Sequence, residues 1–295
     1  MNAIDKSVMQ LESGHTFGRS NNLVGIAKLA ATAPAIRLGQ SRDLCVVMLT
    51  AGMMHNAGPY RLHVELAKSL AQSDVSSFRF DLSGIGESLA VGSSVDSTTR
   101  AVDETKQAID FLHEKFGFNH FVVFGLCSGA DDALNVALAD ARVRGIVMLD
   151  GCGYRTPHYH FHRLVSRHLP FLLRRDKVVR KARSVLGLHD HSAPPASLAP
   201  GLDIREFPDR ETAEKQLQTL VDRGTSLLSI YTGGVHQYYN HTDQFKRMFP
   251  NLNDRGRITV RYRRQWDHVL YLAEDRIALI DEVTDWVAKL GSDNF

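Results

Sequence analysis

The sequence has few cysteines and no long apolar run. Its 295 residues include only three cysteines, at spacings that match neither a disulfide framework nor a zinc motif, which argues against a disulfide-stabilised secreted scaffold. No apolar stretch approaches the roughly 18 residues of a membrane-spanning helix. The N-terminal segment MNAIDKSVMQLESGH has an early aspartate and no apolar core, so it does not resemble a secretory signal. We therefore expect a reduced, cytoplasmic protein.

Other absences narrow the class of protein further. There is no internal repeat and no low-complexity tract. A hydrophobic fraction of 43% and a charged fraction of 23% are ordinary for a globular protein. The length suits one α/β domain that carries an inserted lobe. No motif calls for a cofactor, so none is expected.

Apolar strands and helical segments alternate along most of the chain. A strand, a turn at Asn21-Asn22 and a returning strand at 23–29 are expected within FGRSNNLVGIAKLA. The later predicted strands are 44–50, 76–81, 120–124, 145–150, 227–231 and 258–262, and the predicted helices are 60–71, 102–116, 130–139, one near 244, and 274–290. This order predicts a mostly parallel sheet with helices on both faces and right-handed crossovers.

The alternation stops after Asp150 and resumes only at residue 227. The intervening segment is mostly helical in pattern and rich in histidine, arginine and proline. An insertion between two strands of a regular sheet is typical of a lid. We therefore predict an α/β core formed by residues 1–154 and 223–295, and a helical lid formed by residues 155–222.

The segment Gly125-Leu126-Cys127-Ser128-Gly129 fits the glycine-x-nucleophile-x-glycine pattern of a nucleophile elbow. The central residue of such an elbow sits on a sharp turn between a strand and a helix, and small residues on either side prevent a clash. Here that residue is Cys127, and the dipole of the following helix favours its thiolate. Ser128 would lend its N–H to an oxyanion hole. The alternatives are a buried structural cysteine and a nucleotide-binding loop, although GxGxxG spacing and a Walker lysine are missing.

With this elbow, the chain resembles the α/β-hydrolase superfamily over nearly its whole length. The loop Thr50-Ala51-Gly52-Met53 is similar to the superfamily's oxyanion loop, with Ala51 where histidine is common. The turn from Phe80 to Ser88 is similar to D-x-R-G-x-G-x-S, with Ser83 in place of arginine. The resemblance implies an α/β-hydrolase fold and makes the Met53 N–H the second oxyanion donor.

Within the superfamily the chain looks most like bacterial hydrolase-like proteins associated with exosortase systems. These proteins often carry cysteine in the elbow and a segment like Gly58-Pro59-Tyr60-Arg61 after the oxyanion loop. No substrate follows from this narrower resemblance.

The resemblance also indicates the catalytic base. Trp266-Asp267-His268 lies just beyond the last predicted strand, where the superfamily places its histidine. Position separates His268 from the other histidines, of which the chain has 14 in all. Several of these lie in the predicted lid at 158, 160, 162, 168, 189 and 191, but alternate histidines share a face only on a strand. No cysteine or carboxylate cluster accompanies them, so no metal site is expected.

The acid that would orient His268 has two candidates. The loop after the strand at 227–231, where the acid usually lies, contains no carboxylate before Asp243. Some superfamily members place the acid at the tip of the preceding strand, and Asp150 occupies that place. We favour Asp150, which could orient the imidazole and stabilise its charged form. A Cys–His dyad is the third option, because a thiol needs an orienting acid less than a hydroxyl does.

These residues predict acyl transfer through a thioester acyl-enzyme, by a thioesterase, an esterase or an acyltransferase. From Arg155 to Arg183 the chain carries nine basic residues and one acid, a local charge of +8. Such a segment could bind the phosphates of acyl-CoA or an acidic acyl-carrier protein, touch an anionic membrane, or form a solvated basic face. No nucleic-acid motif is present. The alternative from another class is a non-catalytic, receptor-like member of the same fold, suggested by the missing acid.

Overall fold

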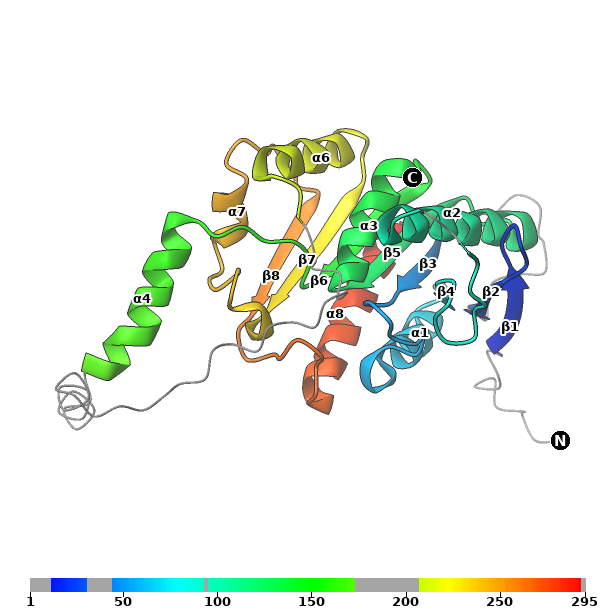
Figure 1. The fold of residues 1–295 in the computed structure, drawn as a ribbon, viewed down its shortest axis with the longest axis horizontal. Coiled ribbons are helices and arrows are strands. Elements are labelled where there is room, and N and C mark those ends of the chain that lie inside the picture. The colour runs from blue at the N-terminus through cyan, green and yellow to red at the C-terminus, as the bar shows by residue number, and fades with distance from the viewer. Residues whose placement is uncertain (1–11, 31–43, 93–94, 173–206, 293–295) are drawn as a thin grey trace.

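Eight strands form one sheet at the centre of the molecule, in the order β1-β2-β4-β3-β5-β6-β7-β8 (Figure 1). The computed structural model describes residues 12–30, 44–92, 95–172 and 207–292. The strands are β1 Glu12–Phe17, β2 Leu23–Lys28, β3 Leu44–Leu49, β4 Ser76–Asp81, β5 His120–Leu126, β6 Val143–Leu149, β7 Ser226–Thr232 and β8 Ile258–Arg263. The helices are α1 Leu62–Gln72, α2 Ser97–Phe116, α3 Ser128–Ala139, α4 Pro157–Leu172, α6 Arg210–Asp222, α7 Gln244–Met248 and α8 Ala273–Ser292.

The sheet is parallel except at one edge, which confirms the predicted fold class. Strands β3 to β8 pair in parallel, whereas β1 with β2 and β2 with β4 pair antiparallel. The first strand of the N-terminal hairpin lies earlier in the chain than predicted. Strand β1 ends at Phe17, and the turn begins at Gly18, before the predicted Asn21-Asn22. In that turn Asn21 donates its N–H to the Gly18 carbonyl at 2.9 Å and adopts a φ of 49°.

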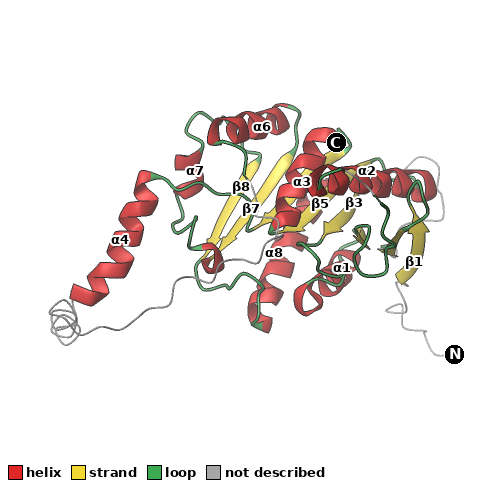
Figure 2. Cartoon of the chain, viewed as in Figure 1, coloured by secondary structure: helices red, strands yellow, loops and turns green. Residues whose placement is uncertain are grey.

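Alternating side chains of the buried strands feed two separate cores. In β5, Phe121 and Val123 point into one cluster, while Val122, Phe124 and Leu126 point into the other. The first core is closed by α2, α3 and α6, and the second by α1 and α8, on opposite faces of the sheet (Figure 2). Burial on both faces explains why these strands are continuous apolar runs in the sequence.

The expected lid contains two described helices with different surroundings. Helix α4 projects from the body of the molecule (Figure 1), and its Tyr159 is buried, donating its hydroxyl to the Gln237 carbonyl at 2.7 Å. Helix α6 instead packs on the sheet, with Leu217 and Leu220 in the first core. Residues 173–206 lie outside the described part of the chain, so the predicted lid boundaries stay a prediction. No helix in the described ranges has the length and apolarity needed to cross a bilayer.

Candidate active site

The predicted elbow is a tight turn between β5 and α3. Cys127 adopts φ 57° and ψ −120°, a conformation that L residues rarely take, and its side chain is half-buried. A Cβ on Gly125 would overlap the Gly129 carbonyl, and one on Gly129 would meet the Thr50 carbonyl at 2.6 Å. Both glycines are therefore required by close backbone approach. The Cys127 N–H donates to the Leu149 carbonyl at 2.9 Å, which ties the elbow to the end of β6.

The structure brings His268 and Asp150 together from segments far apart in the sequence. The Nδ1 atom of His268 lies 2.8 Å from Asp150 Oδ2. Asp150 is fully buried, whereas the His268 side chain is about one-third exposed. Hydrogen bonds from Asp150 and from the Cys127 thiol raise the pKa of His268 to about 10, against the opposing effect of burial. His268 thus contacts both a carboxylate and the elbow cysteine.

Asp150 is itself held by the end of the neighbouring strand β7. Its Oδ1 accepts the Thr232 N–H at 2.6 Å, and its Oδ2 accepts the Thr232 hydroxyl at 2.7 Å. The Asp150 N–H donates to the Ile230 carbonyl at 2.8 Å. Sequence reasoning did not identify Thr232. Its position at the tip of the strand paired with β6 was the available signal.

At Gly233 and Gly234 the loop after β7 leaves no room for any side chain. A Cβ on Gly234 would overlap the His268 backbone nitrogen, and one on Gly233 would overlap the Arg264 carbonyl. The glycine pair therefore lets this loop pack directly against the segment that carries His268. Asp243 lies further on, exposed at the start of α7, and no contact joins it to His268 within the described residues.

The loop after β3 is tied to the elbow by a side chain. Ser128 accepts the Gly52 N–H on its Oγ at 2.9 Å. Gly52 has a φ of 54°, and the Met54 N–H closes the turn on the Ala51 carbonyl at 3.1 Å. Within the described ranges no acceptor engages the Met53 N–H, and the Met53 side chain is 88% exposed. The predicted oxyanion loop is thus held at the elbow by the residue that follows Cys127.

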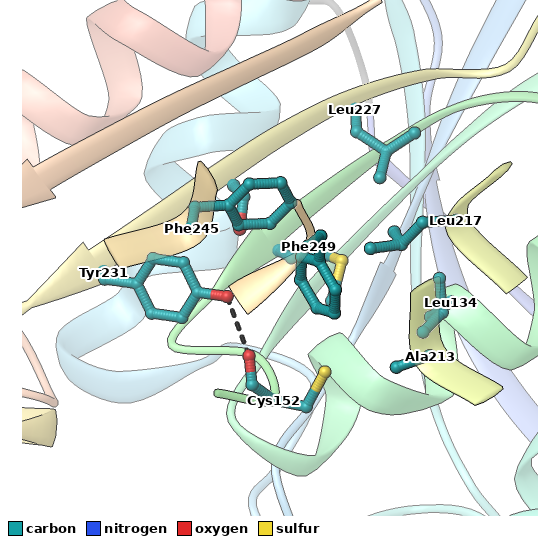
Figure 3. A pocket seen from close by; sticks show the side chains of 10 residues that line it. Leu134, Cys152, Ala213, Leu217, Leu227, Tyr231, Phe245 and Phe249 are labelled. Carbon is teal, nitrogen blue, oxygen red and sulfur yellow. Dashed lines mark hydrogen bonds between the residues drawn. The ribbon is translucent and has the colours of Figure 1, made fainter. Parts of the chain in front are cut away.

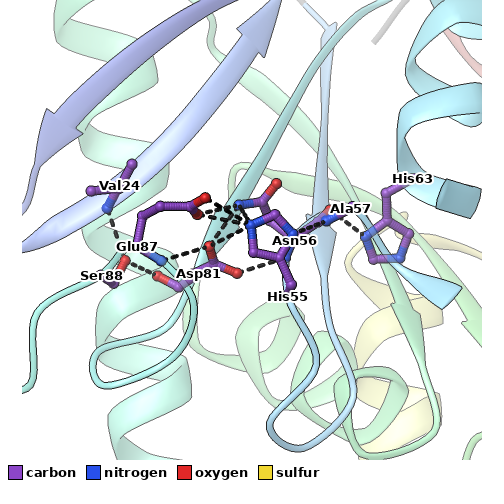
Figure 4. A network of polar contacts seen from close by, with 8 residues as sticks. All are labelled: Val24, His55, Asn56, Ala57, His63, Asp81, Glu87 and Ser88. Carbon is purple, nitrogen blue, oxygen red and sulfur yellow. Dashed lines mark hydrogen bonds and ion pairs between the residues drawn. The ribbon is translucent and has the colours of Figure 1, made fainter.

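A second histidine–carboxylate network lies beyond this loop (Figure 4). Asp81 is fully buried and accepts the Asn56 N–H and the Asn56 Nδ2, each at 2.6 Å. His55 accepts the Ala57 N–H on Nδ1 at 3.1 Å, so its Nε2 donates to Glu87 at 2.9 Å. Burial raises the pKa of Asp81, and its hydrogen bond with Glu87 raises it further while lowering the pKa of Glu87.

This second network has the spacing of a metal site. Ligand atoms of His55, Asp81 and Glu87 lie within 4.8 Å of one another. The Nδ2 of Asn56, however, lies among them, 2.6 Å from Asp81 Oδ2 and 3.3 Å from Glu87 Oε2. An amide donor therefore already engages two of the three candidate ligands. We therefore interpret the network as a hydrogen-bonded brace between the loop at 55–57 and the turn after β4.

A small apolar cavity lies inside the first core and away from the elbow (Figure 3). Leu134, Leu217 and Phe249 line it together with Cys152, whose carbonyl accepts the Tyr231 hydroxyl at 2.7 Å. These apolar side chains belong to the first core, whereas Cys127 packs against the second, on the other face of the sheet. The cavity therefore does not serve the elbow cysteine.

Two predictions about the expected lid concern segments that the structure describes only in part. His158, His160 and His162 lie on helix α4, so their alternation in sequence does not bring them onto one face. The basic segment is described only as far as Leu172. Its cluster at Arg174, Arg175 and Lys177 lies outside the described residues.

The family model described as serine aminopeptidase, S33 (Hydrolase_4) matches residues 42–191, a range that includes Cys127 and Asp150 but not His268. No curated protein matches the sequence.

Many solved structures share the fold. An esterase from Pyrococcus furiosus is 12% identical, with a TM-score of 0.59 over 95% of this chain and 90% of that one. Naproxen esterase from Bacillus subtilis is 15% identical, with a TM-score of 0.54 over 94% and 91%. A protein from Agrobacterium tumefaciens described as a putative α/β hydrolase is 13% identical, with a TM-score of 0.55 over 96% and 98%. At these identities the likeness establishes the α/β-hydrolase fold alone.

Proposed function

The chain belongs to the family described as serine aminopeptidase, S33, and on this premise we propose that it is an acyl-transfer enzyme whose nucleophile is Cys127. The single observation that carries the proposal is the contact of His268 with both Asp150 and the Cys127 thiol. That arrangement is the nucleophile–base–acid geometry of acyl transfer. The family's name refers to serine, whereas the centre of this elbow is cysteine and Ser128 follows it.

The reaction begins with attack by the sulfur of Cys127 on the carbonyl carbon of an ester or thioester. The raised pKa of His268, about 10, keeps its imidazole protonated at neutral pH. The proton it carries is the one given up by Cys127, so the attacking group is the Cys127 thiolate. The imidazolium passes its proton to the departing alkoxide or thiolate as the tetrahedral intermediate collapses. A thioester between Cys127 and the acyl group remains, and His268 is left neutral.

Release of the acyl group uses the same residues in the reverse order. Neutral His268 takes a proton from the incoming water, alcohol or amine while that molecule attacks the thioester carbonyl. The intermediate then expels the Cys127 thiolate. The N–H groups of Met53 and Ser128 are the proposed donors to the oxyanion in both steps, and the bond from Gly52 to Ser128 supports the position of the first. Asp150, held by Thr232, keeps His268 oriented.

The substrate class is proposed from the chemistry of the nucleophile. A thiol exchanges readily with thioesters, so an acyl-CoA or an acyl-carrier protein is a fitting donor. The basic segment that begins at Arg155 would attract the phosphates of such a donor. The narrower resemblance to exosortase-associated hydrolase-like proteins stays a prediction. The alternative, a non-catalytic member of the fold, was suggested by the absence of a carboxylate in the loop after β7. The buried Asp150 beside His268 offers a carboxylate from another strand and so supports catalysis over this alternative.

The test is capture of the acyl-enzyme. The protein is incubated with 4-nitrophenyl butyrate or butyryl-CoA, quenched in acid and mapped by mass spectrometry. We expect a butyryl group on Cys127 and none on Cys45 or Cys152, which are buried and act as internal controls. His268→Ala should slow the labelling. A butyryl group on Ser128 instead would contradict the nucleophile assignment, and absence of both acyl-enzyme and turnover would contradict the function.

A panel of substrates separates acyl transfer from peptidase chemistry. It includes aminoacyl 4-nitroanilides because the family's description names an aminopeptidase. We expect turnover of the esters and thioesters, with little turnover of the anilides. The opposite preference would assign the chain to amide hydrolysis.

A further inference from the structure

Three side chains meet where the segment following the oxyanion loop touches the turn that carries His268. The rings of Tyr60 and Tyr271 pack edge to face, with centroids 5.6 Å apart and planes at 83°. The guanidinium of Arg276, in the first turn of α8, lies 5.2 Å from the centre of the Tyr60 ring. These contacts join residues that are about 200 positions apart in the chain.

Arg276 also holds the turn that follows His268. Its Nη1 donates to the carbonyl oxygens of Leu270 and Tyr271, each at 2.7 Å. At the start of the turn, Asp267 accepts the N–H of Val269 at 2.9 Å and the N–H of Tyr271 at 2.8 Å. His268 thus lies in a turn that is fixed from both ends, and the Tyr60 ring is packed against the outer end.

The backbone around this contact is strained. Tyr60, Arg61 and Leu270 have φ values of 48°, 65° and 54°, in the left-handed region that favours glycine. Leu270 is fully buried, but burial does not explain the conformation of Tyr60, which is 52% exposed, or that of the exposed Arg61. Strained residues that are held by specific contacts gather at functional sites. The contacts available here are those of Tyr60 and Arg276 with the His268 turn.

We propose that Tyr60 and Arg276 are positioning residues that clamp the His268 turn and so set the imidazole against the Cys127 thiol. This inference rests on the proposed function, because it concerns the geometry of the same nucleophile and base. Neither residue touches the reacting atoms. A small displacement of a base relative to its nucleophile costs a large factor in rate, so a clamp on the turn that carries the base can control turnover.

The test compares Tyr60→Gly with two matched variants. Tyr60→Gly relieves the strained backbone but removes the ring, and we expect kcat to fall about 10- to 100-fold with KM within about twofold. Arg61→Gly relieves strain at the adjacent residue and leaves the ring in place, so its kcat should equal that of the wild type. Tyr60→Phe keeps the ring and should also retain kcat. Arg276→Gln, which loses the contact with the ring and at least one carbonyl bond, is expected to match Tyr60→Gly.

A second readout reports the thiol directly and needs no substrate. The rate of alkylation of Cys127 by iodoacetamide is measured from pH 5 to 10, with the buried Cys45 and Cys152 as internal references. Wild-type Cys127 should react at low pH because His268 is beside it, and the Tyr60→Gly and Arg276→Gln profiles should shift to higher pH. Wild-type kcat and profile in both variants would overturn the clamp alone. A wild-type Cys127 that alkylates no faster than the buried cysteines would overturn the proposed function, and the clamp with it.

Discussion

Two histidine–carboxylate networks lie at the carboxyl ends of the parallel strands, and they differ in which other groups the histidine contacts. In one, Asp150 follows β6 and its carboxylate contacts His268, which also contacts the Cys127 thiol. In the other, Asp81 ends β4 and sits within a network that joins Asn56, Glu87 and His55. The carboxyl ends of parallel strands share one edge, so proximity to that edge alone does not distinguish them.

The difference lies in how each buried carboxylate is satisfied. Asp150 takes its bonds from Thr232 and His268, so its charge favours a protonated imidazole. Asp81 takes its strongest bonds from Asn56 and shares a hydrogen bond with Glu87, so its pKa is raised and it stabilises two loops. A histidine beside a carboxylate therefore becomes a candidate base only where a nucleophile completes the pair.

The largest expected effect follows loss of the thiol. Cys127→Ala should lower kcat by roughly 10⁴-fold or more, because the acyl-enzyme cannot form. The melting temperature should stay close to that of the wild type, since alanine has the same backbone preferences at this turn. Initial rates with 4-nitrophenyl butyrate measure kcat, and a thermal melt measures the melting temperature. Wild-type rates in Cys127→Ala together with an inactive Ser128→Ala would move the nucleophile to the serine.

Loss of the orienting acid should come next. Asp150→Asn keeps the shape but removes the charge that holds and stabilises the imidazolium, and we expect kcat to fall about 10²- to 10³-fold. Asp243→Asn is the matched control, because Asp243 is an exposed carboxylate at the start of α7. A greater loss from Asp243→Asn would contradict the assignment of Asp150. Equal, small losses from both would favour a Cys–His dyad.

The stability of the fold should depend on alkaline pH through His268. Its pKa in the folded state is about 10, against an ordinary value of 6.5. A raised pKa means that the protonated ring stabilises the fold fully below pH 6.5 and that this contribution disappears as the pH rises to about 10. Urea titrations at pH 6.5 and 10 should show the unfolding equilibrium constant rise by at least about tenfold. This is less than the full difference between the two pKa values would give, because the His268 side chain is about one-third exposed and solvent screens its interactions.

Asp150→Asn separates this effect from general alkaline destabilisation. The variant lacks the main cause of the raised pKa, so its stability should change less between the two pH values. His63 sharpens the contrast, because burial lowers its pKa to about 4 and it stays neutral throughout this range. An unchanged pH dependence in Asp150→Asn would show that His268 is not responsible.

The second network should affect stability and leave turnover unchanged. Glu87→Gln removes the charge that pairs with His55 and the carboxylate that shares a hydrogen bond with Asp81, and we expect about 1 kcal/mol loss in the free energy of unfolding. The kcat with 4-nitrophenyl butyrate should stay within about twofold of the wild type. Glu65→Gln, at an exposed pair with Lys68, is the control for simple charge removal. A large fall in kcat for Glu87→Gln would erase the distinction between the two networks.

The smallest expected effect concerns the basic segment of the predicted lid. If it attracts a charged acyl donor, raising the ionic strength should raise KM for butyryl-CoA a few-fold and leave KM for 4-nitrophenyl butyrate unchanged. Changing Arg174, Arg175 and Lys177 together to Gln should imitate high salt for the CoA ester only. If the segment instead touches a membrane, the variant should keep wild-type kinetics and lose binding to anionic vesicles.

A charge-matched control completes this experiment. Changing Lys68, Lys215 and Arg255 to Gln removes the same charge from exposed positions elsewhere. A similar rise in KM for butyryl-CoA in the control would assign the effect to net charge. Normal behaviour of the lid variant with both the CoA ester and the vesicles would leave a solvated basic face.

The sequence alone was enough to predict the fold and the elbow, because both depend on patterns of neighbouring residues. Continuous apolar runs such as 44–49 mark strands that are buried on both faces. The glycines around Cys127 report a backbone approach that tolerates no Cβ. The position of His268 after the last strand followed from the resemblance to a superfamily. Each of these signals is carried by residues close together in the chain.

Only the tertiary structure decided which carboxylate meets His268 and what holds the histidine in place. Asp150 and Asp243 were both plausible, since each lies near the end of a strand or its loop. The choice depends on the pairing of β6 with β7, on Thr232 at the tip of β7, and on the glycine-paired loop that packs against His268. The contact of Tyr60 with Tyr271 and Arg276 likewise joins distant segments. Such contacts leave no periodic mark in the sequence, because they depend on how the loops at the end of the sheet meet in space.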